Sequence, residues 1–212
     1  MPSRLFPPGI PIIKRLLDLL LTIPGGILLA PIMLITAVLV RIFHGSPVLF
    51  RHKRPGYRRE LFTLFKFRTM TDTHNADGVL LPDSQRLTIL GRFLRATSLD
   101  EMPELYNVIR GEMSLVGPRP LLIHYLERYT PEQARRQDVL PGITGWAQIN
   151  GRNNVSWEDK FELDVWYVDH WTVWLDLKIL FLTPWKVLAR EGINEPGNAT
   201  AREFMGSQDV ES

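Results

Sequence analysis

The longest apolar stretch of the chain is Leu19–Val40, which contains 22 residues and no charge. Because about 20 apolar residues are enough for a helix to span a bilayer, the pattern predicts a membrane helix rather than a buried helix of a soluble core. The stretch is too long for a cleaved signal peptide and ends without a small-residue cleavage site. We expect a membrane-anchoring helix over residues 14–44, preceded by a flexible N-terminus of residues 1–13.

Two prolines interrupt this helix, Pro24 and Pro31, and each frees a backbone carbonyl that must find another partner in lipid. Basic residues flank the helix on both sides. Since positive charge marks the cytoplasmic side of a membrane, a straight crossing would leave one basic flank on the wrong face. We therefore expect a re-entrant helix, broken at Ala30 and Pro31, that enters and leaves the same leaflet.

The remaining patterns are shorter. Alternating apolar residues on both sides of Arg54–Tyr57 predict a small β-hairpin, with strands at 48–50 and 61–68. Apolar spacings of three and four residues predict helices at 87–96, 100–110, 121–129, 131–139, 157–167 and 176–190. Tryptophan and tyrosine gather in and between the last two, as is typical of the membrane–water interface; they are Trp166, Tyr167, Trp171, Trp174 and Trp185.

The predicted fold class is therefore α+β, mostly helical, with an N-terminal re-entrant membrane helix, interfacial amphipathic helices and a small β-hairpin. Residues 45–190 would form a cytosolic or interfacial catalytic domain. Residues 191–212 would form a loosely ordered tail.

Composition excludes some chemistry. The 212 residues include no cysteine, which rules out disulfides, thiol catalysis and cysteine-ligated metals. The net charge is only +2, yet Arg41–Arg68 contains eight basic residues and one acid. Such a cluster beside a membrane helix is typical of attraction to anionic phospholipids, and it is also suited to a phosphorylated substrate. No nucleic-acid recognition motif is present, so no nucleic-acid partner is expected.

The candidate chemistry centres on Asp100 and Glu101. Pro103 is tolerated only in a first helical turn, so the spacing places Asp100 or its neighbour at a helix N-cap, at the positive end of the helix dipole. Two interpretations remain open. The acids cap the helix, as the capping-box pattern of Ser98 and Glu101 suggests, or an ionised carboxylate serves as nucleophile or metal ligand.

Two loops offer further candidates. Arg119 lies between Pro118 and Pro120, where a rigid backbone would help it clamp a phosphate or carboxylate; an ordinary surface turn with a salt bridge is the alternative. Glycines in the segment 142–151 would permit close approach of a ligand to the backbone. Polar contacts there would come from Gln148, Asn150, Arg152 and Asn153.

Several motifs occur together in this chain. They are Lys14-Arg15-x-x-Asp18, the proline-broken apolar segment, Lys66–Met70, Ser98–Asn107, Ser114–Pro120 and Pro141–Gly145. Together they resemble the bacterial sugar transferases, and among them the monotopic phosphoglycosyl transferases that start protein N-glycosylation, O-antigen and capsule assembly. The resemblance extends from about Lys14 to Glu203, and the chain looks like the minimal form, without extra N-terminal membrane helices. One departure is Ala30-Pro31, where relatives often carry Ser-Pro.

The resemblance implies a two-step transfer. Asp100 would attack the β-phosphate of a UDP-sugar and expel UMP, and polyprenol phosphate (undecaprenyl phosphate) would then take the phosphosugar from the aspartate. Mg²⁺ would lie near Asp100 and Glu101, and Glu101 would be a candidate proton acceptor. Arg119 would bind phosphate, with Lys66, Arg68 and Arg152 as weaker candidates. The site would face the cytoplasm at the bacterial inner membrane.

Two other functions compete with the transferase. A membrane-anchored lipid-binding or scaffold module would use the same apolar helix and basic block, with Asp100 only capping a helix. A membrane-bound phosphohydrolase would use the same aspartate but pass the intermediate to water. The sequence does not reveal the sugar, the pathway or the oligomeric state, and a homodimer is among the alternatives.

Overall fold

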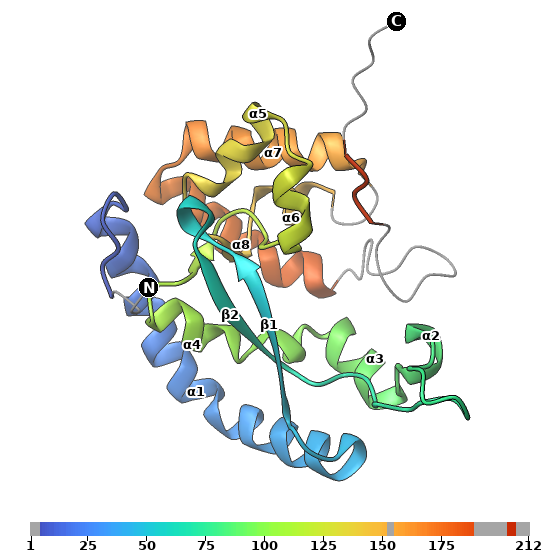
Figure 1. The fold of residues 1–212 in the computed structure, drawn as a ribbon. Helices are drawn as coiled ribbons and strands as arrows, with labels where there is room; N and C mark the ends of the chain where they lie inside the picture. The colour runs from blue at the N-terminus through green and yellow to red at the C-terminus, as the bar shows by residue number, and fades with distance from the viewer. Residues whose placement is uncertain (1–4, 152–154, 189–202, 207–212) are drawn as a thin grey trace, which may run out of the picture.

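The computed structural model describes residues 5–151, 155–188 and 203–206. Its longest element is helix α1, Ile12–His44, which runs for 33 residues with Pro24 and Pro31 inside it. The predicted break at Ala30 and Pro31 is therefore wrong, because the helix continues through both residues. Figure 1 shows α1 curving beneath the β1–β2 hairpin. Among the described residues it is the one helix long and apolar enough to cross a membrane, judged by length and composition.

The burial pattern of α1 is inverted relative to a helix of a soluble core. Its buried residues are mostly polar or charged, whereas its apolar residues, such as Ile27 and Leu28, are exposed. The buried polar residues are Lys14, Arg15, Asp18, Thr22, Thr36 and His44. The polar face of α1 therefore packs on the rest of the protein, and its apolar face points outward.

The predicted β-hairpin is present. Strands β1, Leu49–Pro55, and β2, Leu61–Phe67, pair antiparallel. The turn between them contains the short 3₁₀ helix η1, Tyr57–Arg59, with Arg58 and Arg59 at positive φ. β1 is longer than the predicted strand at 48–50 because its basic residues also pair with β2, where their side chains hide the alternation of apolar positions.

A second sheet was not predicted. Strands β3, Ser114–Val116, and β4, Gly142–Thr144, pair in parallel. The two backbones approach so closely that a Cβ on Gly142 would lie 2.1 Å from the Gly117 nitrogen. Glycine at 142 is thus required by the close approach of the chains rather than by approach of a ligand.

Several predicted helices are shorter or tighter than expected. The segment 121–129 forms a 3₁₀ helix, and 131–139 divides into a capped α-turn and a 3₁₀ turn. The helical elements after β2 are α2 (Asp83–Arg86), α3 (Ile89–Ala96), η2 (Leu99–Glu101), α4 (Glu104–Ile109), η3 (Ile123–Glu127), α5 (Pro131–Ala134), η4 (Arg135–Gln137), α6 (Trp146–Asn150), α7 (Trp157–His170) and α8 (Val173–Leu188). The fold class is α+β and mostly helical, as predicted.

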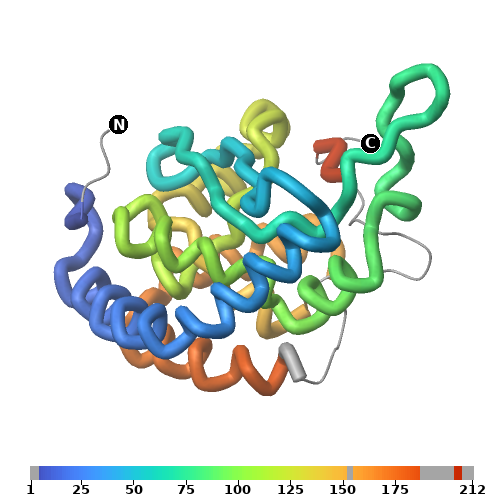
Figure 2. The backbone as a smooth tube through the Cα atoms, turned by 90° about the horizontal axis from the view of Figure 1, so that it is seen from below, coloured from blue at the N-terminus to red at the C-terminus, as the bar shows by residue number. Residues whose placement is uncertain are grey.

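The apolar core consists of several clusters around these elements. One cluster joins Val116 of β3 to Tyr167 of α7 and Ile179 of α8. Another joins Val40 of α1 to Phe67 of β2 and Leu94 of α3. Figure 2 shows α8 close to the start of α1, where Lys14 pairs with Asp176. Since Val40 near the end of α1 is also buried, both ends of the helix contact the same body of protein.

The expected loosely ordered tail, residues 191–212, lies largely outside the described residues. Within it, Phe204 is buried against Tyr125 and Phe161, and its backbone N–H donates to the Tyr125 hydroxyl at 3.0 Å. Glu203 pairs with Arg128 at 2.9 Å. These residues of the tail pack on the body of the protein.

Candidate active site

The segment around Asp100 is not one capped helix. Leu99–Glu101 forms the 3₁₀ turn η2, and α4 starts separately at Glu104, after Pro103. Ser98 adopts a left-handed conformation with φ 57°, and neither η2 nor α4 receives a side-chain capping bond. The capping interpretation of Ser98, Asp100 and Glu101 is therefore wrong. The left-handed residue turns the chain out of α3 and makes the capping-box geometry unattainable.

Asp100 is buried, with 8% of its surface exposed. Burial, and next the negative charge of Glu101, raise the pKa of Asp100 to about 6, against the opposing effect of nearby Lys66, Arg119 and Arg95. We had expected a helix dipole to keep this carboxylate ionised. In the structure nearby cations favour the ionised form but only partly offset burial and Glu101, and a pKa of about 6 leaves the carboxylate mostly ionised at neutral pH.

Glu101 has the opposite electrostatic balance. Burial alone would raise the pKa of Glu101, but Arg119 and Lys66 outweigh it and hold the pKa far below its usual range. The Lys66 Nζ lies 2.7 Å from the Glu101 Oε1, and the Arg119 Nη2 contacts the same oxygen. Two adjacent carboxylates are thus tuned in opposite directions, as is common in active sites.

Glu104 belongs to the same cluster, and sequence reasoning missed it. Its carboxylate is 2% exposed and lies 3.0 Å from the Lys66 Nζ. Burial is the largest cause that raises the pKa of Glu104 to about 7. A signal was available, since a spacing of three residues places Glu101 and Glu104 on one side of a helical segment. An acid in the first turn of a helix is usually explained by its favourable interaction with the helix dipole, so Glu104 was not recognised as a site residue.

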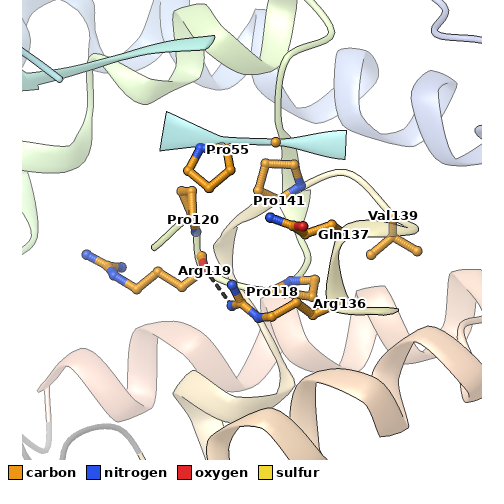
Figure 3. Close-up of a pocket in the computed structure, with 9 residues that line it drawn as sticks. Pro55, Pro118, Arg119, Pro120, Arg136, Gln137, Val139 and Pro141 are labelled. Carbon is orange, nitrogen blue, oxygen red and sulfur yellow. Dashed lines mark hydrogen bonds between the residues drawn. The ribbon is translucent and has the colours of Figure 1, made fainter. Parts of the chain in front are cut away.

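The loop that carries Arg119 is fixed from behind. Arg136 donates from Nη2 to the Arg119 carbonyl at 2.7 Å and pairs with buried Asp164 at 2.7 Å. Figure 3 shows Arg119 and Arg136 beside a small pocket, with the Arg119 side chain pointing away from it. The pocket therefore lies behind the loop, and the Arg119 guanidinium is directed to the acid cluster.

Of the four predicted phosphate-binding residues, Lys66 and Arg119 meet at Glu101. Arg68 does not join them. It donates to the Ser46 and Met70 carbonyls at 3.1 Å and pairs with Asp72 at 2.6 Å, so it ties the end of the hairpin to neighbouring loops. Arg152 lies outside the described residues.

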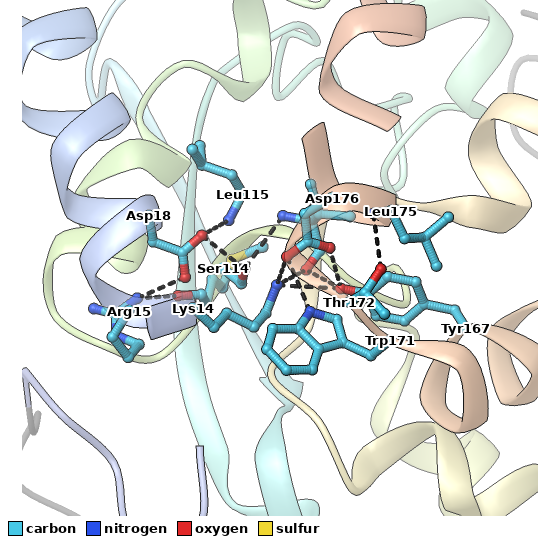
Figure 4. A network of polar contacts seen from close by, with 12 residues as sticks. Lys14, Arg15, Asp18, Ser114, Leu115, Tyr167, Trp171, Thr172, Leu175 and Asp176 are labelled. Carbon is cyan, nitrogen blue, oxygen red and sulfur yellow. Dashed lines mark hydrogen bonds and ion pairs between the residues drawn. The ribbon is translucent and has the colours of Figure 1, made fainter. Parts of the chain in front are cut away.

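The motif Lys14-Arg15-x-x-Asp18 anchors α1 to the catalytic domain (Figure 4). Lys14 Nζ pairs with Asp176 of α8 at 2.7 Å and donates to the Val116 carbonyl at 3.0 Å. Asp18 accepts from the Ser114 hydroxyl at 2.8 Å and the Leu115 N–H at 3.0 Å. These bonds hold β3, from which the chain runs directly into the loop of Arg119.

The donor set at the acid cluster suits a divalent cation only in part. Within the described ranges, no group of three or more acidic or histidine side chains is arranged to hold a metal. Mg²⁺, however, is usually bound through one or two carboxylates together with substrate phosphates. The neighbouring Asp100 and Glu101 carboxylates fit that arrangement.

With this geometry in view, the family can be stated. The family model of the bacterial sugar transferases matches residues 10–190. The chain therefore belongs to the bacterial sugar transferase family.

Curated relatives support the assignment. The chain is 58% identical over 201 residues to the uncharacterized sugar transferase EpsL of Bacillus subtilis (strain 168), covering 95% of this chain and 100% of the relative. It is 41% identical to the UDP-glucose:undecaprenyl-phosphate glucose-1-phosphate transferase of Klebsiella pneumoniae, covering 82% of this chain and 40% of the relative. It is 38% identical to the undecaprenyl-phosphate galactose phosphotransferase of Salmonella typhimurium (strain LT2), covering 85% and 41%.

The chain thus spans about two fifths of the length of the last two relatives. The apolar helix α1, together with relatives named for a lipid phosphate, indicates that the protein is membrane-associated.

Proposed function

We propose that this protein transfers a sugar-1-phosphate from a UDP-sugar to undecaprenyl phosphate, as the first membrane step in the assembly of a glycoconjugate. The names of its relatives support the reaction class. The observation that carries the proposal in this chain is the buried Asp100 beside Glu101, Lys66 and Arg119. A carboxylate that is buried yet ionised at neutral pH is suited to nucleophilic attack.

In the first step, an Asp100 carboxylate oxygen attacks the β-phosphorus of the UDP-sugar. The bond from that phosphorus to the bridging oxygen breaks, and UMP leaves with the electron pair. In the second step, a phosphate oxygen of undecaprenyl phosphate attacks the same phosphorus. The bond to Asp100 breaks, and polyprenyl diphosphate-sugar is released. Lys66 and Arg119 would stabilise the charge that develops on the phosphoryl oxygens.

The role of Glu101 follows from its electrostatics. A carboxylate held far below its usual pKa is a weak base. Its bonds to Lys66 and Arg119 therefore support positioning of these cations more than acceptance of a proton. Asp100 and Glu101 would also hold Mg²⁺, which when bound offsets the negative charge of the phosphates.

The packing of α1 supports a re-entrant anchor. Near its start, Lys14 pairs with Asp176; at its end, Val40 is buried with Leu94, and His44 Nε2 lies 2.7 Å from the Thr88 hydroxyl oxygen. Because both ends contact one catalytic domain, both would lie on one side of the membrane. That side would be the cytoplasmic face of the bacterial inner membrane, where a nucleotide sugar and a lipid phosphate meet.

The mass of the intact protein tests the proposal. Protein held in nanodiscs is incubated with Mg²⁺ and a panel of UDP-sugars, without lipid acceptor. We expect an adduct equal to one phosphosugar, with UMP released, and no adduct in Asp100→Asn. The UDP-sugar of the panel that gives the adduct identifies the sugar.

The remaining outcomes separate the alternatives. Transfer to undecaprenyl phosphate with no adduct would mean direct transfer and overturn the covalent step. An adduct that decays at the same rate with and without undecaprenyl phosphate would indicate a phosphohydrolase. If neither an adduct nor transfer is observed, the protein would instead be a membrane-anchored binding module.

A further inference from the structure

A basic residue outside the cluster described above lies on the same face of the hairpin as Lys66. In the antiparallel register, Arg54 is opposite Phe62 and Phe50 is opposite Lys66. Residues directly opposite each other share a face, and alternate residues along a strand do so too. Arg54 and Lys66 therefore project from one face of the hairpin, the face on which Lys66 meets Glu101 and Glu104.

The other basic residues of β1 project from the opposite face. Lys53 is opposite Thr63, and Arg51 is opposite Phe65, over whose ring its guanidinium lies at 5.8 Å from the centroid. Both Arg51 and Lys53 are exposed. The pleat of β1 thus separates its basic residues. Arg51 and Lys53 project from the outer face of the hairpin, and Arg54 projects from the inner face.

Arg54 has no counter-ion among the described residues. Its guanidinium forms no ion pair there, and its Nε is buried without a hydrogen-bond partner. By contrast, Arg119 and Lys66 are each paired with Glu101. A partly buried guanidinium without an acid is costly, because removal from water is not compensated by an opposite charge.

The surroundings of Arg54 contain the cation Arg119 and the acid Glu104, together with the hydroxyls of Tyr125 and Tyr129. Burial lowers the pKa of Arg54, and the nearby guanidinium of Arg119 lowers it further. Pro55, the next residue, lines the pocket behind the Arg119 loop. Arg54 and Arg119 therefore lie near the same acid cluster. Among the described residues only Arg119 forms an ion pair with it, while Glu104 stabilises the charge of Arg54 without pairing with it.

We propose that Arg54 is a further binding residue for a substrate phosphate, forming with Arg119 a paired-guanidinium site that is completed by the bound phosphate. The inference rests on the proposed function, since it takes the substrates to be phosphate esters. Planar guanidinium groups bind phosphate oxygens in a bidentate fashion. The phosphate comes either from the UDP-sugar or from the polyprenol phosphate, and separate arms of the experiment distinguish the two.

Binding is measured by calorimetry on nanodisc-held protein, so that the result does not depend on turnover. The probes are UDP in one arm and undecaprenyl phosphate in the other. The variants are Arg54→Gln and Arg54→Lys, with Lys53→Gln as the matched control. The control removes one positive charge from the adjacent position on the outer face.

We expect Arg54→Gln to weaken one of the two ligands by about tenfold or more, in line with the loss of charged hydrogen bonds. Arg54→Lys should recover part of the affinity, and Lys53→Gln should change neither arm by more than about twofold. Loss in the UDP arm assigns Arg54 to the donor, and loss in the lipid arm assigns it to the acceptor.

Unchanged affinity in both arms would overturn the inference, as would an equal loss in Arg54→Gln and Lys53→Gln. If Arg54→Gln does not fold, the test rests on Arg54→Lys. An Arg54→Lys variant that unfolds at the wild-type temperature and binds both ligands with wild-type affinity would also overturn the inference. Failure of the proposed function looks different. The wild type would then form no adduct and transfer no sugar phosphate, whatever the effect of Arg54 on UDP binding.

Discussion

One ammonium group, that of Lys66, links two carboxylates whose pKa values are shifted in opposite directions. It lies 2.7 Å from the Glu101 Oε1 and 3.0 Å from the Glu104 Oε1. Burial lowers the pKa of Lys66, but the pull of Glu101 and the other acids outweighs it and raises the pKa. Lys66 therefore stays charged, and its field favours the ionised form of Asp100 as well.

The first prediction concerns pH. Because the pKa of Asp100 is raised to about 6, chiefly by burial, the nucleophile is lost as the pH falls through that value. We expect the rate of adduct formation from a UDP-sugar to be constant above about pH 7 and to fall about tenfold per pH unit well below pH 6. Single-turnover mass spectrometry across pH 5–8 measures it.

Lys66→Gln serves as the control for that profile. Removal of the cation takes away one of the effects that lower the pKa of Asp100, so the acid limb should move to higher pH. A limb that stays in place in Lys66→Gln would show that another group controls the profile.

A second prediction concerns Ser98, whose φ of 57° turns the chain from α3 into η2. A β-branched residue in the left-handed region is strained. We expect Ser98→Val to lower the free energy of unfolding by about 1–2 kcal/mol, whereas Ser98→Gly should be neutral or mildly stabilising. Denaturant unfolding in detergent measures both; equal stability of the two variants would contradict the left-handed assignment.

At the scale of elements, predictability followed the length of the pattern. The hairpin was predictable because β2 alternates over seven residues, Leu61–Phe67. Strands β3 and β4 have three residues each and pair across a long crossover. They are too short to show an alternation of apolar and polar residues, and no hairpin turn joins them, so the sequence pattern does not predict them. The separation of η2 from α4 was hidden for another reason, because a serine rather than a glycine adopts the left-handed conformation.

A third prediction concerns the link between α1 and α8. Lys14 and Asp176 are both nearly inaccessible, and Asp176 also accepts from the Tyr167 hydroxyl at 2.7 Å. Loss of one partner of a buried pair leaves an uncompensated charge. We expect Lys14→Met to lower the free energy of unfolding by about 3 kcal/mol, measured by denaturation in detergent micelles.

The double variant Lys14→Met, Asp176→Leu is the test of coupling. If the pair interacts directly, the double variant should lose clearly less stability than the sum of the single variants. Strict additivity would mean that Lys14 acts through its bond to the Val116 carbonyl rather than through Asp176.

At the scale of the whole molecule, local motifs indicated which residues matter but not how they meet. The resemblance marked Asp100, Glu101 and Arg119 as a site, and the structure brings the last two into contact. Arg68 was a candidate by its motif, yet it follows the end of β2, where it donates to the Ser46 carbonyl and pairs with Asp72. Distances between elements depend on tertiary packing, and a single sequence does not contain them in any local pattern.

The last prediction concerns the anchor as a whole. The exposed face of α1 is apolar while its polar face packs on the rest of the protein, so we expect lipid to cover the apolar face. A straight crossing would pull one end of α1 from that domain and leave Lys14 or His44 without the partners described above. Both flanks of the helix should therefore lie on the cytoplasmic side.

The chain contains no cysteine, so single cysteines can report on this directly. Phe6→Cys precedes α1, Val79→Cys lies in the catalytic domain, and Leu28→Cys lies in the middle of α1; all three positions are exposed on the protein. With a membrane-impermeant maleimide, we expect the first two to react only after spheroplasts are lysed, and Leu28→Cys to stay protected by lipid in both conditions. Labelling of Phe6→Cys in intact spheroplasts, with Val79→Cys still protected, would mean that α1 crosses the membrane.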